Sequence, residues 1–217
     1  MKMKSMENIT TILFDIDGTL LNTTKFILNS TEHSLKTHGH TVPSHAEIAK
    51  HVGKHFDTFY QILTGLTEVK HLQDSHREFQ ENNYHLSELY SNTVEVLTKF
   101  KAAGFRLGSV TSRTKNTVHA TLVQAGIDSF FEVVITPQDS PGLKPDPAPL
   151  FKALELLGEK PEHALMVGDS NLDVEAGKNA GTRTARATYG FHTEFLHDPE
   201  PDIIIADIKD LLSYFNL

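Results

Sequence analysis

Past residue 93, short apolar runs alternate with longer segments whose apolar residues recur every three to four positions. The short runs are rich in Val, Ile and Leu, as strands buried on both faces usually are. Strands that alternate with helices are typical of an α/β fold, in which helices cover both faces of a parallel sheet. We therefore predict strands over residues 105–111, 132–136, 164–167, 183–187 and 203–206, and helices over residues 115–125, 149–157 and 173–180 and from 209 onward.

The first predicted strand is the apolar run Ile12 to Phe14, which ends in the motif Asp-Ile-Asp-Gly-Thr over residues 15–19. Side chains alternate along a strand, so Asp15 and Asp17 emerge on the same side where the run ends. Gly18 then allows the backbone to turn away. Two neighbouring carboxylates repel each other unless a cation or a shared proton relieves them. The motif therefore favours a site for a hard metal ion with oxygen ligands.

Other motifs for metals and nucleotides do not match this chain. An EF-hand loop needs a glycine at its sixth position and an acid at its twelfth, whereas here the glycine is fourth and the twelfth residue is Phe26. The sequence contains no Walker lysine loop, no G-x-G-x-x-G and no H-E-x-x-H. Because Asp and Gly also suit an ordinary solvated turn, the interpretation of residues 15–19 depends on the rest of the chain.

The segment between the first two predicted strands has a different pattern, with helical spacing throughout and few β-branched residues. We expect Asn22 to cap a helix that runs through Leu35 and stops before Gly39. Ser44 opens a second helix through a capping box and Gly53 ends it. Residues 55–63 and 68–89 continue the helical spacing. We therefore predict an all-helical cap domain at residues 22–90, inserted into a core domain of residues 1–21 and 91–217.

The composition of the chain argues against several kinds of partner and site. The formal net charge of −8 argues against nucleic acid as the main partner, and no segment approaches the length of a membrane span. The absence of cysteine excludes disulfides and zinc–thiolate sites and is typical of a reducing compartment. The start, residues 1–8, has no apolar stretch behind its lysines, so we expect a cytoplasmic protein without a secretory signal. Most of the 13 histidines lie between His33 and His85 without a metal-ligand spacing, which favours solvated helix faces.

Three more polar sites follow predicted strands or precede helices. Thr111 and Ser112 close the second strand, Gly168 to Asp173 follows a later one, and Lys144 stands just before a helix. Each has an ordinary explanation, as a helix cap or a solvated loop lysine. The carboxyl ends of parallel strands, however, meet at one edge of the sheet. Four such sites at the same edge favour a single functional centre.

With these four motifs in order, the chain resembles a haloacid dehalogenase-superfamily phosphatase of the phosphoglycolate phosphatase-like or pyrophosphatase-like branch. The family's D-x-D-G-T corresponds to Asp15 to Thr19, its strand-end threonine to Thr111, its lysine to Lys144, and its G-D-x-x-x-D to Gly168 to Asp173. The resemblance covers nearly the whole chain and implies a Rossmann-like parallel core with an inserted helical cap. One departure is Asn22, where relatives often carry an aspartate.

The resemblance also implies a reaction. A phosphoric monoester would be hydrolysed through an aspartyl-phosphate on Asp15, with Asp17 as general acid and then general base. The two roles together need a carboxyl group that can both carry and release a proton. The implied cofactor is Mg²⁺, with its ligands drawn from Asp15, the Asp17 backbone carbonyl, Asp169 and, through water or from farther out, Asp173.

Phosphate binding in this family implies roles for three more residues. Thr111 and the Ser112 backbone amide would hold phosphate oxygens, and Lys144 would balance the charge of phosphate and Asp15. In the cap, Gly53 and Lys54 correspond to a loop that dips onto the substrate. Lys54 would offer a cation to a second anionic group. A structural alternative for this pair is a helix-ending glycine followed by a solvated lysine.

Competing interpretations remain open. A hexose-phosphate mutase shares both aspartates and the lid, although mutase relatives tend to carry an arginine shortly after the lid glycine, where this chain has Lys54 and His55. A receiver-like signalling domain would use a phosphorylated aspartate without Asp17 or a lid. A dehalogenase usually lacks the second acid. The substrate is a small phosphorylated compound; phosphoglycolate- and pyrophosphate-like substrates are favoured, and nucleoside and sugar phosphates remain open, as does the oligomeric state.

Overall fold

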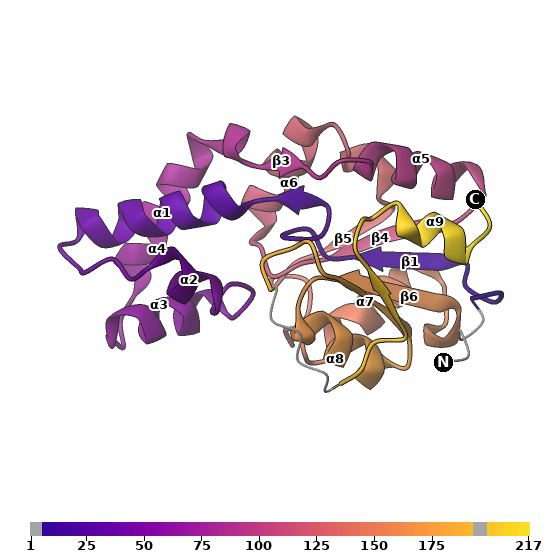
Figure 1. The fold of residues 1–217 in the computed structure, drawn as a ribbon. Coiled ribbons are helices and arrows are strands. Elements are labelled where there is room, and N and C mark those ends of the chain that lie inside the picture. Colours follow the sequence, from indigo (N-terminus) through magenta and orange to yellow (C-terminus); the bar gives the residue numbers. More distant parts are fainter. Residues whose placement is uncertain (1–5, 193–198) are drawn as a thin grey trace.

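The computed structural model describes residues 6–192 and 199–217. Residues 1–5, on which the expectation about a secretory signal partly rests, lie outside the described residues. A six-stranded parallel sheet forms the centre, in the order β5-β4-β1-β6-β7-β8 (Figure 1). Its strands are β1 (Thr11–Phe14), β4 (Arg106–Val110), β5 (Val133–Ile135), β6 (Ala164–Gly168), β7 (Arg183–Ala187) and β8 (Ile203–Ile205). The α/β fold with a parallel sheet is confirmed.

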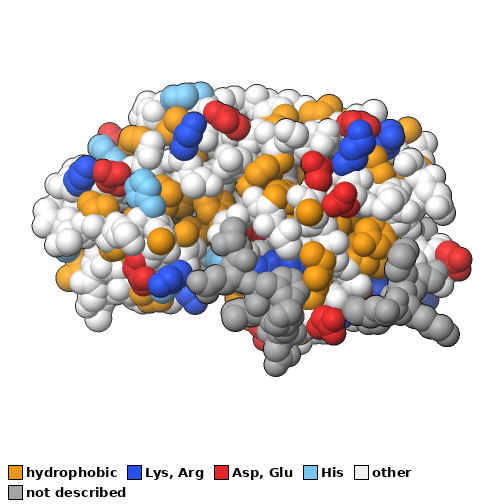
Figure 2. Space-filling view, in the orientation of Figure 1, with side chains coloured by type: hydrophobic (Ala, Val, Ile, Leu, Met, Phe, Trp, Pro, Cys, Tyr) orange, Lys and Arg blue, Asp and Glu red, His pale blue; other side chains and the backbone are white. Residues whose placement is uncertain are grey.

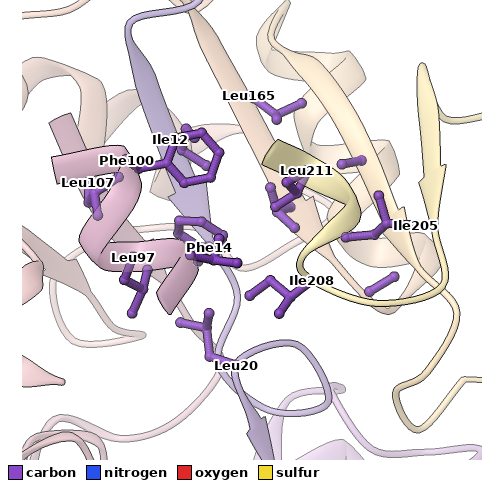
Figure 3. Close-up of a cluster of buried hydrophobic side chains, with 14 of the residues drawn as sticks. Ile12, Phe14, Leu20, Leu97, Phe100, Leu107, Leu165, Ile205, Ile208 and Leu211 are labelled. Atoms are coloured by element: carbon purple, nitrogen blue, oxygen red, sulfur yellow. The ribbon is translucent and has the colours of Figure 1, made fainter. Parts of the chain in front are cut away.

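Helices cover both faces of this sheet. Side chains alternate along β1, so its successive residues pack against opposite layers of helices. Ile12 and Phe14 pack into one cluster and Leu13 into another on the opposite face. The first cluster is completed by α5 (Thr93–Ala102), α6 (Lys115–Ala125) and α9 (Asp210–Tyr214). The second is completed by α7 (Ala148–Leu157) and α8 (Asn171–Ala180). Figure 3 shows Phe100, Leu97 and Leu211 converging on Ile12 and Phe14.

The predicted elements of this core agree with the structure to within a few residues. The strand at 183–187 and the helix at 115–125 are reproduced to the residue as β7 and α6. Short 3₁₀ helices at Tyr84–Leu86, Asp128–Phe130 and Pro161–His163 lie in the connections. After β1 the chain adds β4 and β5 on one side of this strand and then β6, β7 and β8 on the other side. The strand order therefore reverses at β1. A reversal of this kind opens a crevice at the carboxyl ends of the strands.

Four helices stand beyond these carboxyl ends (Figure 1): α1 (Thr24–Thr37), α2 (His45–Ala49), α3 (Phe56–Thr64) and α4 (Lys70–Glu81). They share a buried apolar cluster of their own, which includes Leu35, Ile48, Tyr60 and Leu72. Whether residues 22–90 form a separate domain with the expected limits stays a prediction. Among the described residues, no helix combines the length and the apolar character needed to cross a membrane.

Several details of this insert differ from expectation. Asn22 is not the N-cap of α1, which begins at Thr24; its side chain accepts a hydrogen bond from the Thr24 N–H at 3.2 Å. Asn22 instead belongs to β2 (Leu21–Asn22), which pairs antiparallel with β3 (Glu88–Leu89). The helix expected over 68–89 ends at Glu81. Strands of two residues have no periodicity to detect, and this pair joins segments far apart in sequence.

The helix that Ser44 opens is also shorter than expected. The Ser44 side chain accepts from the Glu47 N–H, as an N-cap does, but α2 ends at Ala49 and not at Gly53. The residues after it leave the helix and approach the core, where the carbonyl of Gly53 accepts from the Ser112 hydroxyl at 3.1 Å. The early end of α2 therefore supplies a loop that contacts the edge of the sheet.

Candidate active site

The turn after β1 brings Asp15 and Asp17 to the edge of the sheet. The Asp15 N–H donates to the carbonyl of Val167 at 2.8 Å, so β1 remains paired with β6 up to this residue. Gly18 then adopts a φ of +81°, and a Cβ at this position would lie 2.3 Å from Oδ2 of Asp169. A glycine is required here both for the turn and for the close approach of the Asp169 carboxylate.

Lys144 lies at the centre of the site. Its Nζ donates to Oδ1 of Asp15 at 2.7 Å, to Oδ1 of Asp173 at 2.6 Å and to the carbonyl of Val110 at 2.9 Å. These bonds use all three hydrogens of the ammonium group. Burial alone would lower the pKa of Lys144, but the carboxylates of Asp15 and Asp173 outweigh it and raise the pKa. Lys144 is therefore a fixed cation that joins the ends of β1 and β4 to the start of α8.

The remaining two carboxylates follow β6 and are almost fully buried. Oδ2 of Asp169 accepts from the backbone N–H of Phe191 at 2.6 Å and of His192 at 3.4 Å. Asp173 forms a capping box with Ser170, whose hydroxyl donates to Oδ2 of Asp173 at 2.5 Å. A Cβ at Gly190 would lie 2.2 Å from Oδ2 of Asp169, so the loop before Phe191 also packs tightly on this carboxylate.

Asp15, Asp169 and Asp173 form a cluster that suits a divalent cation. One carboxylate oxygen from each lies within 4.8 Å of the others. Burial raises the pKa of Asp15; Lys144 opposes this, the carboxylates of Asp173 and Asp17 add to it, and the pKa becomes about 7. Burial and the same kind of neighbours also raise the pKa of Asp169 well above its usual value. Three carboxylates against one ammonium leave a formal excess of two negative charges, which a hard divalent cation would neutralise.

Asp17 has a different partner, Arg113, which the sequence analysis missed. Nη2 of Arg113 donates to Oδ1 of Asp17 at 2.7 Å and Nε donates to Oδ2 at 2.8 Å. The guanidinium also donates to the Thr121 hydroxyl and lies 4.6 Å from the ring centroid of Phe26. A bidentate pair of this kind fixes both the distance and the orientation of the carboxylate. Asp17 is therefore held against Arg113 in this structure.

Thr111 and Ser112 lie at the end of β4 with different surroundings. Ser112 lines a cleft above the carboxylates, whereas Thr111 is not among the described residues that line it. The Thr111 hydroxyl accepts from the Arg113 N–H at 3.1 Å and is buried. Thr111 therefore holds the backbone of Arg113. Arg113 directly follows the Thr-Ser pair, and this position is the sequence signal that could have indicated it.

The cleft has a volume of about 910 Å³, counted to its open side, and its walls come from both parts of the chain. The floor comes from the strand ends and includes Asp15, Asp17, Ser112, Arg113, Lys144 and Asp169. The roof comes from residues 22–90 and consists of Ile27, Val52, Gly53, Lys54, Phe56, Phe59, His76, Arg77 and Gln80. Gly53 and Lys54, the two cap residues expected near the substrate, thus lie against the same cleft as Asp15.

Among the described residues, side-chain hydrogen bonds from Ser112 and His192 join the roof to the core. Besides the bond from Ser112 to the Gly53 carbonyl, Nε2 of His192 lies 3.2 Å from the carbonyl of Val52. Gly53 has a φ of +92°, a conformation that favours glycine and presents its carbonyl to the core. Lys54 is exposed beside this contact.

The histidines gather over α1–α4, on the part of the surface where Figure 2 shows most of the pale blue side chains. For exposed helical members such as His45 in α2 and His71 in α4, the expectation of a solvated helix face is confirmed. For His76 it is wrong, because this residue is 4% exposed and lines the cleft. Helical spacing alone could not distinguish the inner face of α4 from its outer face.

The sequence of this chain is similar to those of known proteins. A model of the haloacid dehalogenase-like hydrolase family matches residues 12–187. The pyrophosphatase PpaX of Bacillus cereus is 38% identical over 207 residues, which cover 94% of this chain and 95% of that protein.

Solved structures give the same result. A predicted phosphoglycolate phosphatase from Haemophilus somnus 129PT superimposes with a TM-score of 0.88 at 29% identity, covering 96% of this chain and 98% of that one. A haloacid dehalogenase-like family hydrolase from Streptococcus pneumoniae shares the fold with a TM-score of 0.86 at 22% identity, covering 96% and 99% of the two chains. The chain belongs to the haloacid dehalogenase-like hydrolase family and is a phosphatase of that family.

Proposed function

We propose that this phosphatase hydrolyses a small phosphoric monoester with the help of Mg²⁺ and through an aspartyl-phosphate on Asp15. The observation that carries the proposal is the position of Asp15. Its carboxylate follows the central strand, faces the cleft, is held by Lys144 at 2.7 Å and lies in a cluster with Asp169 and Asp173. A nucleophile, a fixed cation and a set of oxygen ligands thus meet at one point of the sheet edge.

The carboxylate cluster supports a resident divalent cation. Its donors are all oxygens, they are buried, and their formal excess of two negative charges equals the charge of Mg²⁺. Asp15, Asp169 and the backbone carbonyl of Asp17 would hold the ion. Both oxygens of Asp173 are engaged by Lys144 and Ser170, so Asp173 would act on the site through these partners. When bound, the ion would supply positive charge to the phosphoryl oxygens as negative charge develops on them.

The first half of the reaction then follows from the side chains. Lys144 orients the Asp15 carboxylate through Oδ1 and balances its charge. Asp15 attacks the phosphorus, the bond from phosphorus to the leaving oxygen breaks, and Asp17 gives that oxygen a proton. Ser112 at the floor would donate to a phosphoryl oxygen through its backbone amide, and Thr111 would contribute by holding the loop behind it.

In the second half, Asp17 takes a proton from a water molecule, and this water attacks the phosphorus of the aspartyl-phosphate. Inorganic phosphate leaves and the Asp15 carboxylate is restored. Because Arg113 pairs with both oxygens of Asp17, the substrate must compete for this guanidinium or displace it before Asp17 can take part in proton transfer.

The test is phosphate release from p-nitrophenyl phosphate by the purified protein. Activity should require Mg²⁺ and stop with a chelator. Asp15→Asn should lose turnover, on the order of 10⁴-fold or more, as enzymes do without their nucleophile. Rapid acid quench followed by mass spectrometry should detect a phosphoryl group on the peptide that contains Asp15. Equal rates in the wild-type protein and Asp15→Asn would overturn the nucleophile assignment.

The same experiment distinguishes the competing functions. A receiver-like domain would keep its phosphoryl group, whereas a phosphatase should lose it within a turnover. A hexose-phosphate mutase would convert one sugar-phosphate isomer into another without net phosphate release. The names of the relatives make pyrophosphate and phosphoglycolate the first substrates to compare. A cytoplasmic location stays a prediction from the sequence.

A further inference from the structure

The roof of the cleft is mostly apolar, although the floor below it is charged. Ile27, Val52, Phe56 and Phe59 contribute apolar surface from α1, the loop after α2, and α3. Phe56 and Phe59 both contact Tyr60, at ring-centroid distances of 5.5 and 5.2 Å, so the aromatic wall is fixed by neighbouring rings. A substrate whose phosphorus lies at Asp15 must place its leaving group beneath this wall.

The polar groups buried in this roof are uncharged. His76 lies 2.8 Å from the Tyr60 hydroxyl, 3.1 Å from the Ser30 hydroxyl and 2.8 Å from Nε2 of Gln80. Burial, with the nearby charges of Arg113 and Arg77, lowers the pKa of His76 to about 3. The imidazole is therefore neutral at physiological pH. Both ring nitrogens of His76 are engaged within the roof, so this residue fixes Tyr60, Ser30 and Gln80 in place and brings no positive charge to the cleft.

The cations around the cleft are engaged or peripheral. In the floor, Lys144 is bound by Asp15 and Asp173, and Arg113 is bound by Asp17. In the roof, Arg77 pairs with Asp74 at 2.9 Å and lies over the ring of Phe56, 5.1 Å from its centroid. Lys54 is exposed at the rim. A phosphate or carboxylate on the leaving group would meet an Arg77 that already pairs with Asp74 and a Lys54 whose charge water screens, so its transfer from water to the apolar wall would be costly.

The lining of the cleft is mostly apolar, as is typical of sites for organic ligands that carry a few polar groups. Inorganic pyrophosphate has no apolar atom, and phosphoglycolate has a single methylene group. Neither would use the side chains of Ile27, Phe56 and Phe59.

We propose that the roof binds an uncharged aromatic ring on the leaving alcohol, so that this protein prefers phosphomonoesters with such a ring, such as nucleoside 5′-monophosphates, to pyrophosphate and phosphoglycolate. The inference rests on the proposed phosphatase activity and adds the class of its substrate. The ring lies against Phe56 and Ile27, and the phosphate reaches Asp15.

The experiment compares adenosine 5′-monophosphate with ribose 5-phosphate, in the presence of Mg²⁺. Both have the same leaving oxygen on a pentose, and they differ in the ring that the roof would bind. We expect kcat/KM for the nucleotide to be at least tenfold higher, the size that contact between a base and an aromatic side chain usually gives. Pyrophosphate and phosphoglycolate should fall below the nucleotide as well.

Variants at two phenylalanines locate the effect. Phe56→Ala should lower kcat/KM for the nucleotide roughly tenfold, a clearly larger loss than for ribose 5-phosphate. Phe79→Ala is the matched control, since Phe79 is a half-buried ring in the same helical region, packed on His33 at 5.1 Å and absent from the cleft lining. It should change neither substrate. Phe56→Leu keeps an apolar side chain and should retain the fold if Phe56→Ala does not.

The outcomes separate this inference from the proposed function. Equal kcat/KM for adenosine 5′-monophosphate and ribose 5-phosphate would overturn the inference, and so would a preference for pyrophosphate or phosphoglycolate over the nucleotide. In either case, Mg²⁺-dependent release of phosphate that needs Asp15 would leave the proposed function intact. No hydrolysis of any substrate, including p-nitrophenyl phosphate, would overturn both.

Discussion

The floor and the roof of the cleft are built on opposite principles. In the floor, four carboxylates and two cations meet at the carboxyl edge of the sheet, and each cation is fixed by at least two bonds. In the roof, apolar side chains surround a neutral histidine. The floor can stabilise and move charge, and the roof can distinguish leaving groups. Substitutions in the floor should therefore lower the activity on every substrate alike, whereas the effect of substitutions in the roof should differ from one substrate to another.

After Asp15, the largest substrate-independent effect is expected at Asp17. Asp17→Asn should lower turnover by roughly 10²–10⁴-fold on all substrates, the range usual for a general acid–base group. Folding and metal binding should survive, because the amide keeps the shape of the carboxyl group. Steady-state kinetics, with calorimetric titration of Mg²⁺, would measure both, and Asp128→Asn at an exposed aspartate serves as the control. Near-normal turnover of Asp17→Asn would contradict the acid–base role.

Lys144→Ala tests whether the floor depends on its fixed cation. The change leaves Asp15 and Asp173 buried without their ammonium partner, and loss of one member of a buried ion pair costs about 3–5 kcal/mol. The metal-free variant should lose that much free energy of unfolding in a urea titration. Mg²⁺ should restore part of the loss because it supplies positive charge to the same carboxylates.

Lys152→Ala is the matched control for this variant, because Lys152 pairs at the surface with Glu155 at 2.8 Å. Surface ion pairs of this kind contribute about 0–1 kcal/mol. A metal-free Lys144→Ala protein as stable as Lys152→Ala would show that Lys144 does not stabilise the floor.

A pair of glycines separates backbone strain from the chemistry of the floor. Gly18 and Gly39 both have a positive φ, +81° and +72°, so alanine at either position costs roughly 1–2 kcal/mol. Only at Gly18 would the new Cβ meet Asp169, since nothing lies within 4 Å of a Cβ at Gly39. Gly18→Ala should in addition weaken the apparent affinity for Mg²⁺ by about 10–100-fold, as disturbance around metal ligands usually does. Equal affinities in the two variants would contradict a metal role for Asp169.

The smallest effect is expected at the rim of the roof. Lys54→Ala should lower kcat/KM about two- to fivefold for substrates with a second anionic group, such as phosphoglycolate, and spare p-nitrophenyl phosphate. An exposed lysine contributes little because water screens its charge. Competition between the two substrates in one reaction would resolve a change of this size. Equal losses on both, or none on either, would rule out a role for Lys54 in recognising charge.

Much of the core could be predicted because its signals are local. The alternation of strand and helix patterns past residue 93 indicated β4 to β8 and the helices α6 to α9, although not α5, and short apolar strands of this kind are typical of a parallel sheet. The boundaries of the insert could not be predicted in the same way. The β2–β3 pair has two residues on each side, too few for any period, and its partners lie on opposite sides of four helices.

The sequence alone placed Asp15, Lys144 and Asp169 at one edge of the sheet, since parallel strands bring their carboxyl ends together wherever the chain runs between them. The tertiary structure decided which of these groups touch. Arg113 reaches Asp17 across 96 positions, and Lys144 reaches Asp15 across 129. It also decided that His76 faces inward with Phe56 above the floor. Periodicity describes one element at a time, whereas these contacts depend on how separate elements pack.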